Sequence, residues 1–265
     1  MEKANSTMKK LIFTIAVLLA IPLNAQHISR VEPPNWWVGM ENSHVQLMIY
    51  GENIAAYTAS ISNENVILES AIRTGNKNYQ FLNLDLSNAA PGKFEIAFSK
   101  RGKRTDFTYT YELKERDPNS KWRKGFDSSD VIYLITPDRF ANANPGNDIV
   151  EGLLEQKIDR NHDYARHGGD IQGITKNLGY ISQMGFTAIW PCPVLINDMP
   201  RSSYHGYAIT DLYKVDPRFG TLEDLVELST KSRANGMGLI MDQVANHIGI
   251  EHWWMKDLPM NNWVN

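Results

Sequence analysis

The sequence is poor in cysteine and has no surplus of positive charge. Its 265 residues contain one cysteine, Cys192, which excludes an intrachain disulfide framework and a zinc site built from several cysteines. The 27 Lys and Arg residues are outnumbered by 30 Asp and Glu residues, so nothing favours binding to nucleic acid phosphates. Hydrophobic residues at 42% and charged residues at 22% exclude wholesale disorder, collagen and coiled coil. At about 100–200 residues per domain, this length allows two domains or one large one.

Long apolar runs are scarce, and the clearest one lies near the N-terminus. Lys9 and Lys10 precede an uncharged apolar run over residues 11–20, and Ala25 offers a small residue for cleavage. This order predicts a secretory signal peptide over residues 1–25, because the apolar run is short for a membrane span. An uncleaved N-terminal anchor is the alternative. We therefore expect an exported, periplasmic protein.

The first half of the chain alternates between apolar and polar residues with period two. Within residues 26–112 this alternation covers 45–50, 82–86, 94–98 and 107–111, with turn residues between the runs. Several short strands at close spacing predict an all-β, immunoglobulin-like sandwich. Charged residues with proline and glycine follow over 113–128, and we interpret them as a linker.

The hydrophobic pattern changes over residues 129–265. Continuous apolar runs at 131–135, 186–190 and 237–241 are typical of strands that are buried on both faces. Helical patterns separate these runs, so the order predicts parallel strands with right-handed crossovers. Functional loops in such folds follow the carboxyl ends of the strands, and that is where the polar motifs of this chain lie.

Two helices are expected between these strands. Asp170 is placed to cap the first helix, which Gly185 ends. Thr221 with Asp224 resembles a capping box at the start of the second helix, which ends near Gly236.

The first polar cluster combines Asn and Asp side chains around a glycine pair. Such oxygens suit a hard cation with about six to eight oxygen ligands, and calcium fits better than magnesium because amides outnumber carboxylates. The alternative is an Asn-rich turn in which Asp170 acts only as a helix cap. The cluster comprises Asn142, Asn144, Asn147 and Asp148, with Gly168 and Asp170 downstream.

The second cluster is aromatic, with Tyr204, His205 and Tyr207 close together in the chain. An aromatic ring beside an imidazole at a strand exit can stack on a sugar face and donate a hydrogen bond. The alternative is a packed tyrosine with a satisfied histidine.

The third cluster, Asp242, Asn246 and His247, follows the third predicted strand directly. Polar groups at a barrel rim indicate a site. A hydrogen-bonded structural network is the equal alternative.

Taken together, these segments resemble the α-amylase family, glycoside hydrolase family 13. Within it they resemble the neopullulanase, cyclomaltodextrinase and maltogenic amylase group, in an exported form of the Bacteroides type. DQVANH has the DxxxNH form of the family's first conserved region, and the YHGY segment precedes it in the order that the family shows. The resembling segments are EPPNWWVGM (32–40), VIYLITPDRFANANPGND (131–148), HGGDIQGI (167–174), SSYHGYAITDLYKVDPRFGT (202–221), GLIMDQVANH (238–247) and HWWMKDLP (252–259).

The resemblance implies a fold and a set of site residues. The fold would be the sandwich followed by the first three βα units of a (β/α)8 TIM barrel, which is left incomplete. Tyr207 would stack on the sugar at the cleavage subsite, His205 and His247 would hydrogen-bond its hydroxyls, and Asp242 would orient an arginine near the nucleophile. A structural Ca2+ would be held by Asn142, Asn144, Asn147, Asp148, Asp170 and the Gly168 carbonyl. Relatives often carry Asp where this chain has Asn144, which lowers the expected affinity.

The resemblance also implies an activity. The family hydrolyses α-1,4 or α-1,6 glucosidic bonds in α-glucans such as pullulan, starch or cyclodextrin, and the sandwich often helps to build a homodimer. An aspartate nucleophile and a glutamate acid/base, with carboxyls about 5–5.5 Å apart, perform this retaining reaction. They follow the fourth and fifth barrel strands, so we expect neither in this chain and no activity from it alone.

Two other functions compete with this interpretation. One is a non-catalytic α-glucan-binding protein. The other is an α/β enzyme of another class, which is disfavoured because the sequence shows no Schiff-base lysine motif and no phosphate-binding glycine loop.

Overall fold

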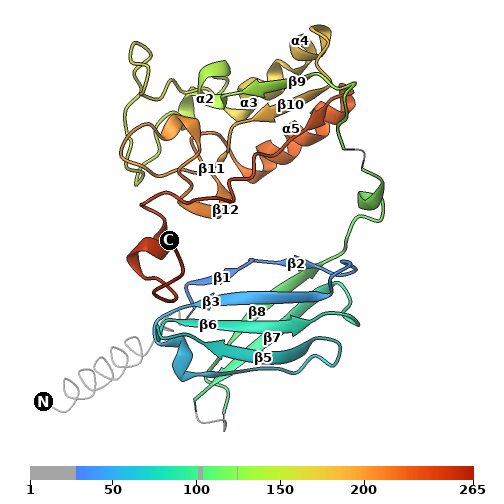
Figure 1. Cartoon of the computed structure of the whole chain (residues 1–265), viewed down its shortest axis with the longest axis vertical. Helices are drawn as coiled ribbons and strands as arrows, with labels where there is room; N and C mark the ends of the chain where they lie inside the picture. The colour runs from blue at the N-terminus through green and yellow to red at the C-terminus, as the bar shows by residue number, and fades with distance from the viewer. Residues whose placement is uncertain (1–27, 101–103, 124) are drawn as a thin grey trace, which may run out of the picture. The chain divides into compact units, whose positions relative to one another are not determined.

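The computed structural model describes residues 28–100, 104–123 and 125–265. The signal peptide predicted over 1–25 lies outside the described residues. The chain divides into two compact units, one ending at Glu115 and the other comprising Arg116–Asn265 (Figure 1). Within the described ranges, we find no helix with the length and apolar character needed to cross a membrane.

The first unit is all-β, as predicted, and is built from two four-stranded sheets. One sheet has the order β1-β3-β6-β5 and the other β2-β8-β7-β4. Every strand pair is antiparallel except β2 with β8, which is parallel. The strands are β1 (Arg30–Glu32), β2 (Trp36–Trp37), β3 (His44–Tyr50), β4 (Thr58–Ile61), β5 (Ile67–Arg73), β6 (Tyr79–Asp85), β7 (Gly92–Ser99) and β8 (Phe107–Lys114), with a 3-10 turn η1 (Ile54–Ala56) after β3.

The core of the first unit contains the alternating residues that the sequence singled out. Leu82 and Leu84 of β6 and Ile96 and Phe98 of β7 are fully buried in one cluster. Period-two alternation did not reveal β1, β2, β4 and β5, which are either short or largely exposed; in β5, for example, Ile67 is 49% exposed. A strand whose side chains mostly face solvent has no reason to alternate in sequence.

The second unit contains a parallel three-stranded sheet with the order β13-β10-β9 and a separate antiparallel pair, β11 with β12. Its strands are β9 (Ile132–Ile135), β10 (Ala188–Pro191), β11 (Leu195–Ile196), β12 (Asp211–Val215) and β13 (Gly238–Leu239). Its helices are α2 (Pro137–Phe140), α3 (Ile171–Lys176), α4 (Leu178–Gln183) and α5 (Leu222–Ala234), and its 3-10 turns are η2 (Ser120–Trp122), η3 (Pro145–Asn147), η4 (Ser203–His205) and η5 (Trp253–Lys256).

The three predicted parallel strands are present, but two expectations about their surroundings need correction. The helix expected from Asp170 to Gly185 is two short helices, because Asn177 leaves the helical conformation and its side chain donates to the carbonyl of Gly173 at 2.7 Å. The third strand, expected over 237–241, is only the two-residue β13. Asp170 does cap α3, and the capping box of Thr221 and Asp224 is present at the start of α5.

Candidate functional site

The predicted site residues of the second and third clusters meet at Tyr207, just after η4. The backbone N–H of Tyr207 donates to Nδ1 of His205 at 2.9 Å, and its backbone carbonyl lies 2.9 Å from Nε2 of His247. The phenol donates to Oδ2 of Asp242 at 2.8 Å. Four residues that are up to 42 positions apart in the sequence therefore form one hydrogen-bonded cluster.

These contacts decide which imidazole nitrogen carries the proton in each neutral ring. Because Nδ1 of His205 accepts a hydrogen bond, the neutral ring carries its proton on Nε2, which can donate to a ligand. Burial lowers the pKa of His205, which favours this neutral form, although Glu155 opposes the shift. A carbonyl oxygen can only accept, so Nε2 of His247 donates to Tyr207 and the neutral ring of His247 keeps Nδ1 as an acceptor.

Asp242 holds a second aromatic residue that sequence reasoning missed. The indole N–H of Trp190, on β10, donates to Oδ2 of Asp242 at 3.0 Å, so this oxygen accepts two hydrogen bonds. Desolvation raises the pKa of Tyr207, and its hydrogen bond to Asp242 and the nearby thiol of Cys192 raise the pKa further. The phenol therefore stays protonated and keeps donating to Asp242. Trp190 ends a predicted strand, and that position was the signal that could have revealed it.

A buried network fixes the turn that carries His205 and Tyr207. Ser203 is fully buried, and its backbone N–H donates to Oε2 of Glu155 at 2.8 Å. Its carbonyl accepts from Asn197 at 3.1 Å, and its hydroxyl accepts from Arg166 at 3.3 Å. The three contacts hold η4 through both its backbone and its side chain. They anchor the turn to two loops, the one between η3 and α3 and the one after β11.

Gly206 follows this turn in the left-handed region, with φ of +80°. A Cβ at this position would lie 2.0 Å from the carbonyl oxygen of Pro193. Only glycine fits there, because both the backbone conformation and the neighbouring carbonyl exclude a side chain. The position of Tyr207 relative to His205 depends on this glycine.

Charged groups surround the network on its buried side. Arg218 and Asp216 are both fully buried and pair at 2.7 Å. Burial by itself would raise the pKa of Asp216, but hydrogen bonds and charge from Arg218, with the charge of Arg166, hold it below its ordinary value. Arg139 lies over the Tyr204 ring, with its guanidinium carbon 3.9 Å from the ring centroid. Tyr204 is therefore held as part of the scaffold.

Some of the predicted calcium-ligand oxygens have no hydrogen-bond partner, and others do. Oδ1 of Asn142 and Oδ1 of Asn147 are buried and accept no hydrogen bond, which leaves both oxygens available to a cation. A Cβ at Gly168 would lie 2.6 Å from Oδ1 of Asp148 and 2.8 Å from Nδ2 of Asn142, so these residues crowd together. Oxygen-rich, mainly amide groups of this kind suit Ca2+.

The other three predicted ligand side chains already accept hydrogen bonds. Oδ1 of Asp148 accepts from Nδ2 of Asn142 at 2.7 Å. Oδ2 of Asp170 accepts the backbone N–H groups of Ala143 and Asn144, while its Oδ1 caps Gly173. Oδ1 of Asn144 accepts from Gly146 at 3.2 Å. Across the described stretches, no group of three or more His, Cys, Asp and Glu side chains is arranged to hold a metal ion. The donor set that fits a cation here thus rests on amides and one carboxylate, Asp148.

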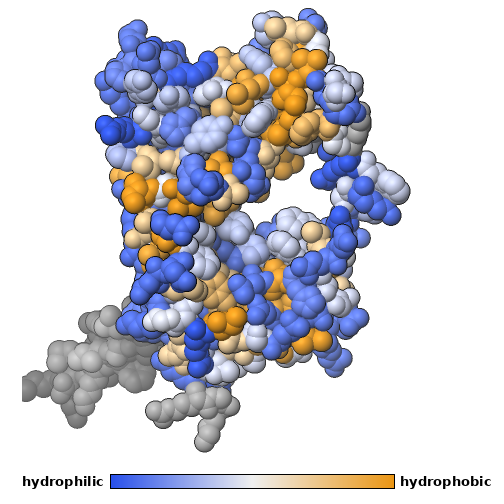
Figure 2. All heavy atoms as spheres, viewed as in Figure 1, coloured by the Kyte–Doolittle hydropathy of each residue, from blue (hydrophilic) through white to orange (hydrophobic). Residues whose placement is uncertain are grey.

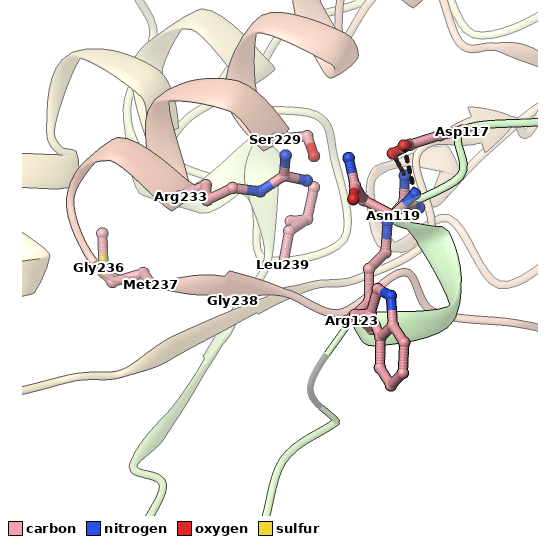
Figure 3. A pocket seen from close by; sticks show the side chains of 10 residues that line it. Asp117, Asn119, Arg123, Ser229, Arg233, Gly236, Met237, Gly238 and Leu239 are labelled. Carbon is pink, nitrogen blue, oxygen red and sulfur yellow. Dashed lines mark hydrogen bonds and ion pairs between the residues drawn. The ribbon is translucent and has the colours of Figure 1, made fainter.

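The described residues of the second unit line at least three cavities. One of about 620 Å³ is lined by His247 and Trp254, and one of about 220 Å³ between α5 and β13 reaches Asp242. The third, of about 690 Å³, lies near η2 and contains none of the predicted site residues; Figure 3 shows Arg233 and Leu239 at one side and the Asp117–Arg123 pair at the other. The cluster around Tyr207 therefore borders the first two cavities.

Apolar side chains also reach the surface of the second unit. Leu222 and Val226 of α5 are 61% and 58% exposed beside the cavity of about 220 Å³. Figure 2 shows apolar side chains over the part of this unit where α4, α5 and the parallel sheet lie.

Two family models match the chain. Residues 134–262 match the catalytic domain of α-amylase, and residues 30–117 match the N-terminal domain of cyclomaltodextrinase. The first match contains the whole cluster around Tyr207, and the second contains both β-sheets of the first unit.

Individual relatives agree with these matches. A β/α-amylase of Paenibacillus polymyxa is 40% identical over 131 residues, which are 49% of this chain and 10% of that protein. Neopullulanase 2 of Thermoactinomyces vulgaris is 32% identical over 166 residues, 62% of this chain and 27% of that protein. The crystal structure of an Anoxybacillus α-amylase is 43% identical, with a TM-score of 0.46 over 51% of this chain and 28% of its own.

The aligned region thus spans about a quarter or less of the length of these curated relatives. The resemblance drawn from the motifs is confirmed by both family models: the chain belongs to the α-amylase family, with the N-terminal domain of the cyclomaltodextrinase group.

Proposed function

We propose that this chain binds a glucose unit of an α-glucan and belongs to an enzyme that hydrolyses α-1,4 or α-1,6 glucosidic bonds. The observation that carries the proposal is the convergence of His205, His247 and Asp242 on Tyr207. The parallel sheet β13-β10-β9 would be the beginning of a (β/α)8 barrel, with this cluster at the carboxyl ends of its strands. Pullulan, starch and cyclodextrin are the substrates we propose.

Each member of the cluster supplies a different contact. The Tyr207 ring would stack on the sugar face, and Nε2–H of His205 would donate to a sugar hydroxyl. Nε2 of His247 already donates to the Tyr207 carbonyl, so Nδ1, which lies 3.5 Å from Nδ2 of Asn246, would accept from another hydroxyl in place of that amide. With Oδ2 of Asp242 engaged, Oδ1 remains to orient an arginine or to accept from the sugar.

We further propose that the 265-residue chain binds glucan without cleaving it. A retaining mechanism needs a nucleophile and a separate acid/base, with carboxyls about 5–5.5 Å apart. In the cluster around Tyr207 the acidic side chain is Asp242, and one of its oxygens already accepts from Tyr207 and Trp190. One carboxylate held in this way cannot perform both roles.

The test is to titrate the chain with maltotetraose by calorimetry and to assay reducing sugar released from pullulan. We expect measurable binding and no release above a buffer blank. Tyr207→Ala should weaken binding roughly tenfold or more, as expected for an aromatic anchor. Tyr180→Ala, which removes an exposed ring from α4, should leave binding unchanged.

Three results would contradict these proposals. Absence of maltotetraose binding would refute glucan recognition, and reducing-sugar release would refute inactivity. Equal binding by Tyr207→Ala would remove Tyr207 from the site. The alternative function is a non-catalytic glucan-binding protein. The gene sequence distinguishes the two, because codons for a catalytic Asp and Glu in later strand motifs of the same reading frame would favour the hydrolase.

We propose that the second unit holds a structural Ca2+ through the oxygens of Asn142, Asn147 and Asp148 and the Gly168 carbonyl, with Asn144 and Asp170 beside them. The support is the pair of buried amide oxygens that accept no hydrogen bond. Because a cation that binds only the folded state stabilises it, added Ca2+ should raise the unfolding temperature. Asn147→Ala should abolish this rise and the exposed Asn161→Ala should not; an unchanged rise in Asn147→Ala would refute the site.

Two further proposals rest on the N-terminal sequence and on the family resemblance. We propose export to the periplasm through residues 1–25, which cell fractionation would test. We also propose a homodimer formed through the first unit; a monomer by sedimentation equilibrium would refute it.

A further inference from the structure

Trp190 is partly exposed although its neighbours on the same strand are buried. Its neighbours Ile189 and Pro191 on β10 are buried, whereas Trp190 is 37% exposed. Successive side chains of a strand point to opposite faces, so Trp190 lies on the face opposite Ile189, which belongs to the apolar core. The ring is thus directed away from the core that holds Ile189.

The indole makes one polar contact, and it is to the candidate site. Its N–H donates at 3.0 Å to the same Oδ2 of Asp242 that accepts from the Tyr207 phenol at 2.8 Å. An indole nitrogen can only donate, and the ring is rigid, so this contact fixes the carboxylate in one orientation. Hydrogen bonds to a charged acceptor are among the stronger ones in proteins.

Resting on the proposed glucan-binding function, we propose that Trp190 is a positioning residue for this site. It acts through Asp242: the indole holds the carboxylate, the carboxylate holds the Tyr207 phenol, and the phenol fixes the ring that meets the sugar. Filling Oδ2 also leaves Oδ1 as the oxygen free to face a ligand. Trp190 thereby sets the position of both an aromatic and an acceptor without supplying the stacking ring itself.

The central experiment is a double-mutant cycle on maltotetraose affinity. Trp190→Phe keeps a ring and removes the N–H, so binding should weaken by about threefold to tenfold, part of the value of one charge-assisted hydrogen bond. Asp242→Ala should weaken binding more. If Trp190 acts through Asp242, the double variant should bind no worse than Asp242→Ala alone.

Additive effects of the two substitutions would overturn the inference, because Trp190 would then contribute without the carboxylate. Equal affinity of Trp190→Phe and the wild type would also overturn it. Trp122→Phe is the matched control, since it removes an exposed tryptophan outside the cluster. That variant should retain wild-type affinity.

A second measurement separates failure of this inference from failure of glucan binding. The chain is labelled with 3-fluorotyrosine, and the ¹⁹F signal of Tyr207, assigned by its loss in Tyr207→Phe, is recorded without sugar. Trp190→Phe should move this signal towards its position in Asp242→Ala. If wild type fails to bind maltotetraose but the signal moves, the positioning role stands and the ligand is wrong. An unmoved signal refutes the positioning role whatever the binding result.

Discussion

At the scale of single residues, the left-handed glycine after η4 controls the site. Gly206→Ala would place a methyl group 2.0 Å from the Pro193 carbonyl at a φ of +80°. We expect it to lower the free energy of unfolding by about 2 kcal/mol or more, because strain and overpacking add. Urea unfolding would measure this change, with Gly179→Ala as the control, since a Cβ there meets open space. Equal stability of the two variants would contradict this account of the turn.

Protonation of His205 should make the stability of the protein depend on pH. Its pKa is lowered from the ordinary value of 6.5, chiefly by burial, so the folded chain binds this proton less tightly than the unfolded chain does. The resulting contribution to stability is present above pH 6.5 and is lost as the pH falls through the lowered pKa. We expect His205→Asn to reduce the loss of unfolding free energy between about pH 7.5 and about pH 5.5.

The chain offers a matched control for that experiment. His162 also accepts a backbone N–H two residues later through Nδ1, at 3.2 Å, but in an exposed turn. We therefore measure the loss of unfolding free energy between the two pH values by urea unfolding. This loss should differ less from wild type in His162→Asn than in His205→Asn. A pH dependence that is the same in His205→Asn and wild type would contradict the predicted effect of burial.

At the scale of secondary structure, α5 depends on its first turn. The Thr221 hydroxyl accepts from the Asp224 N–H at 3.1 Å, and the Asp224 carboxylate accepts from the Thr221 N–H at 2.8 Å. We expect Thr221→Ala to cost about 1 kcal/mol of unfolding free energy, as the loss of a helix cap does. Thr221→Ser keeps the hydroxyl and should retain most of the stability in the same chemical unfolding measurement. A Thr221→Ser variant as unstable as Thr221→Ala would show that the cap is not the cause.

Element boundaries show where sequence patterns succeed. The capping box was visible in the sequence because its two residues are three positions apart and each bonds to the other's backbone. The break at Asn177 was not visible, because the apolar positions Ile174, Leu178 and Ile181 continue across it and all three remain buried. A break in a helix that preserves the buried face leaves no trace in apolar spacing.

At the scale of the whole molecule, each unit has its own core. The buried cluster of the first unit contains residues 28–113, and that of the second contains residues 135–237. We therefore expect residues 28–115 to fold when produced alone. Circular dichroism should show β-structure, and thermal unfolding should be cooperative. A broad, non-cooperative transition would contradict an independent core.

What the sequence determined by itself is local or repeated along the chain. Alternation gave the buried faces of β6 and β7, continuous apolar runs gave the three parallel strands, and short-range spacing gave both helix caps. These features depend on residues a few positions apart, so one chain segment contains all the information. The family resemblance also rested on contiguous motifs.

Only the tertiary structure decided how those motifs meet. It placed the phenol of Tyr207 on Asp242, engaged one nitrogen of each histidine with the backbone of Tyr207 and brought Trp190 to the same carboxylate oxygen. Residues 190, 207 and 242 come from three separate segments. Parallel pairing of β10 with β13 brings Trp190 near Asp242, and the turn after η4 brings Tyr207 to the same carboxylate. A hydrogen bond depends on distance and direction in space, which spacing along a chain does not specify for segments this far apart.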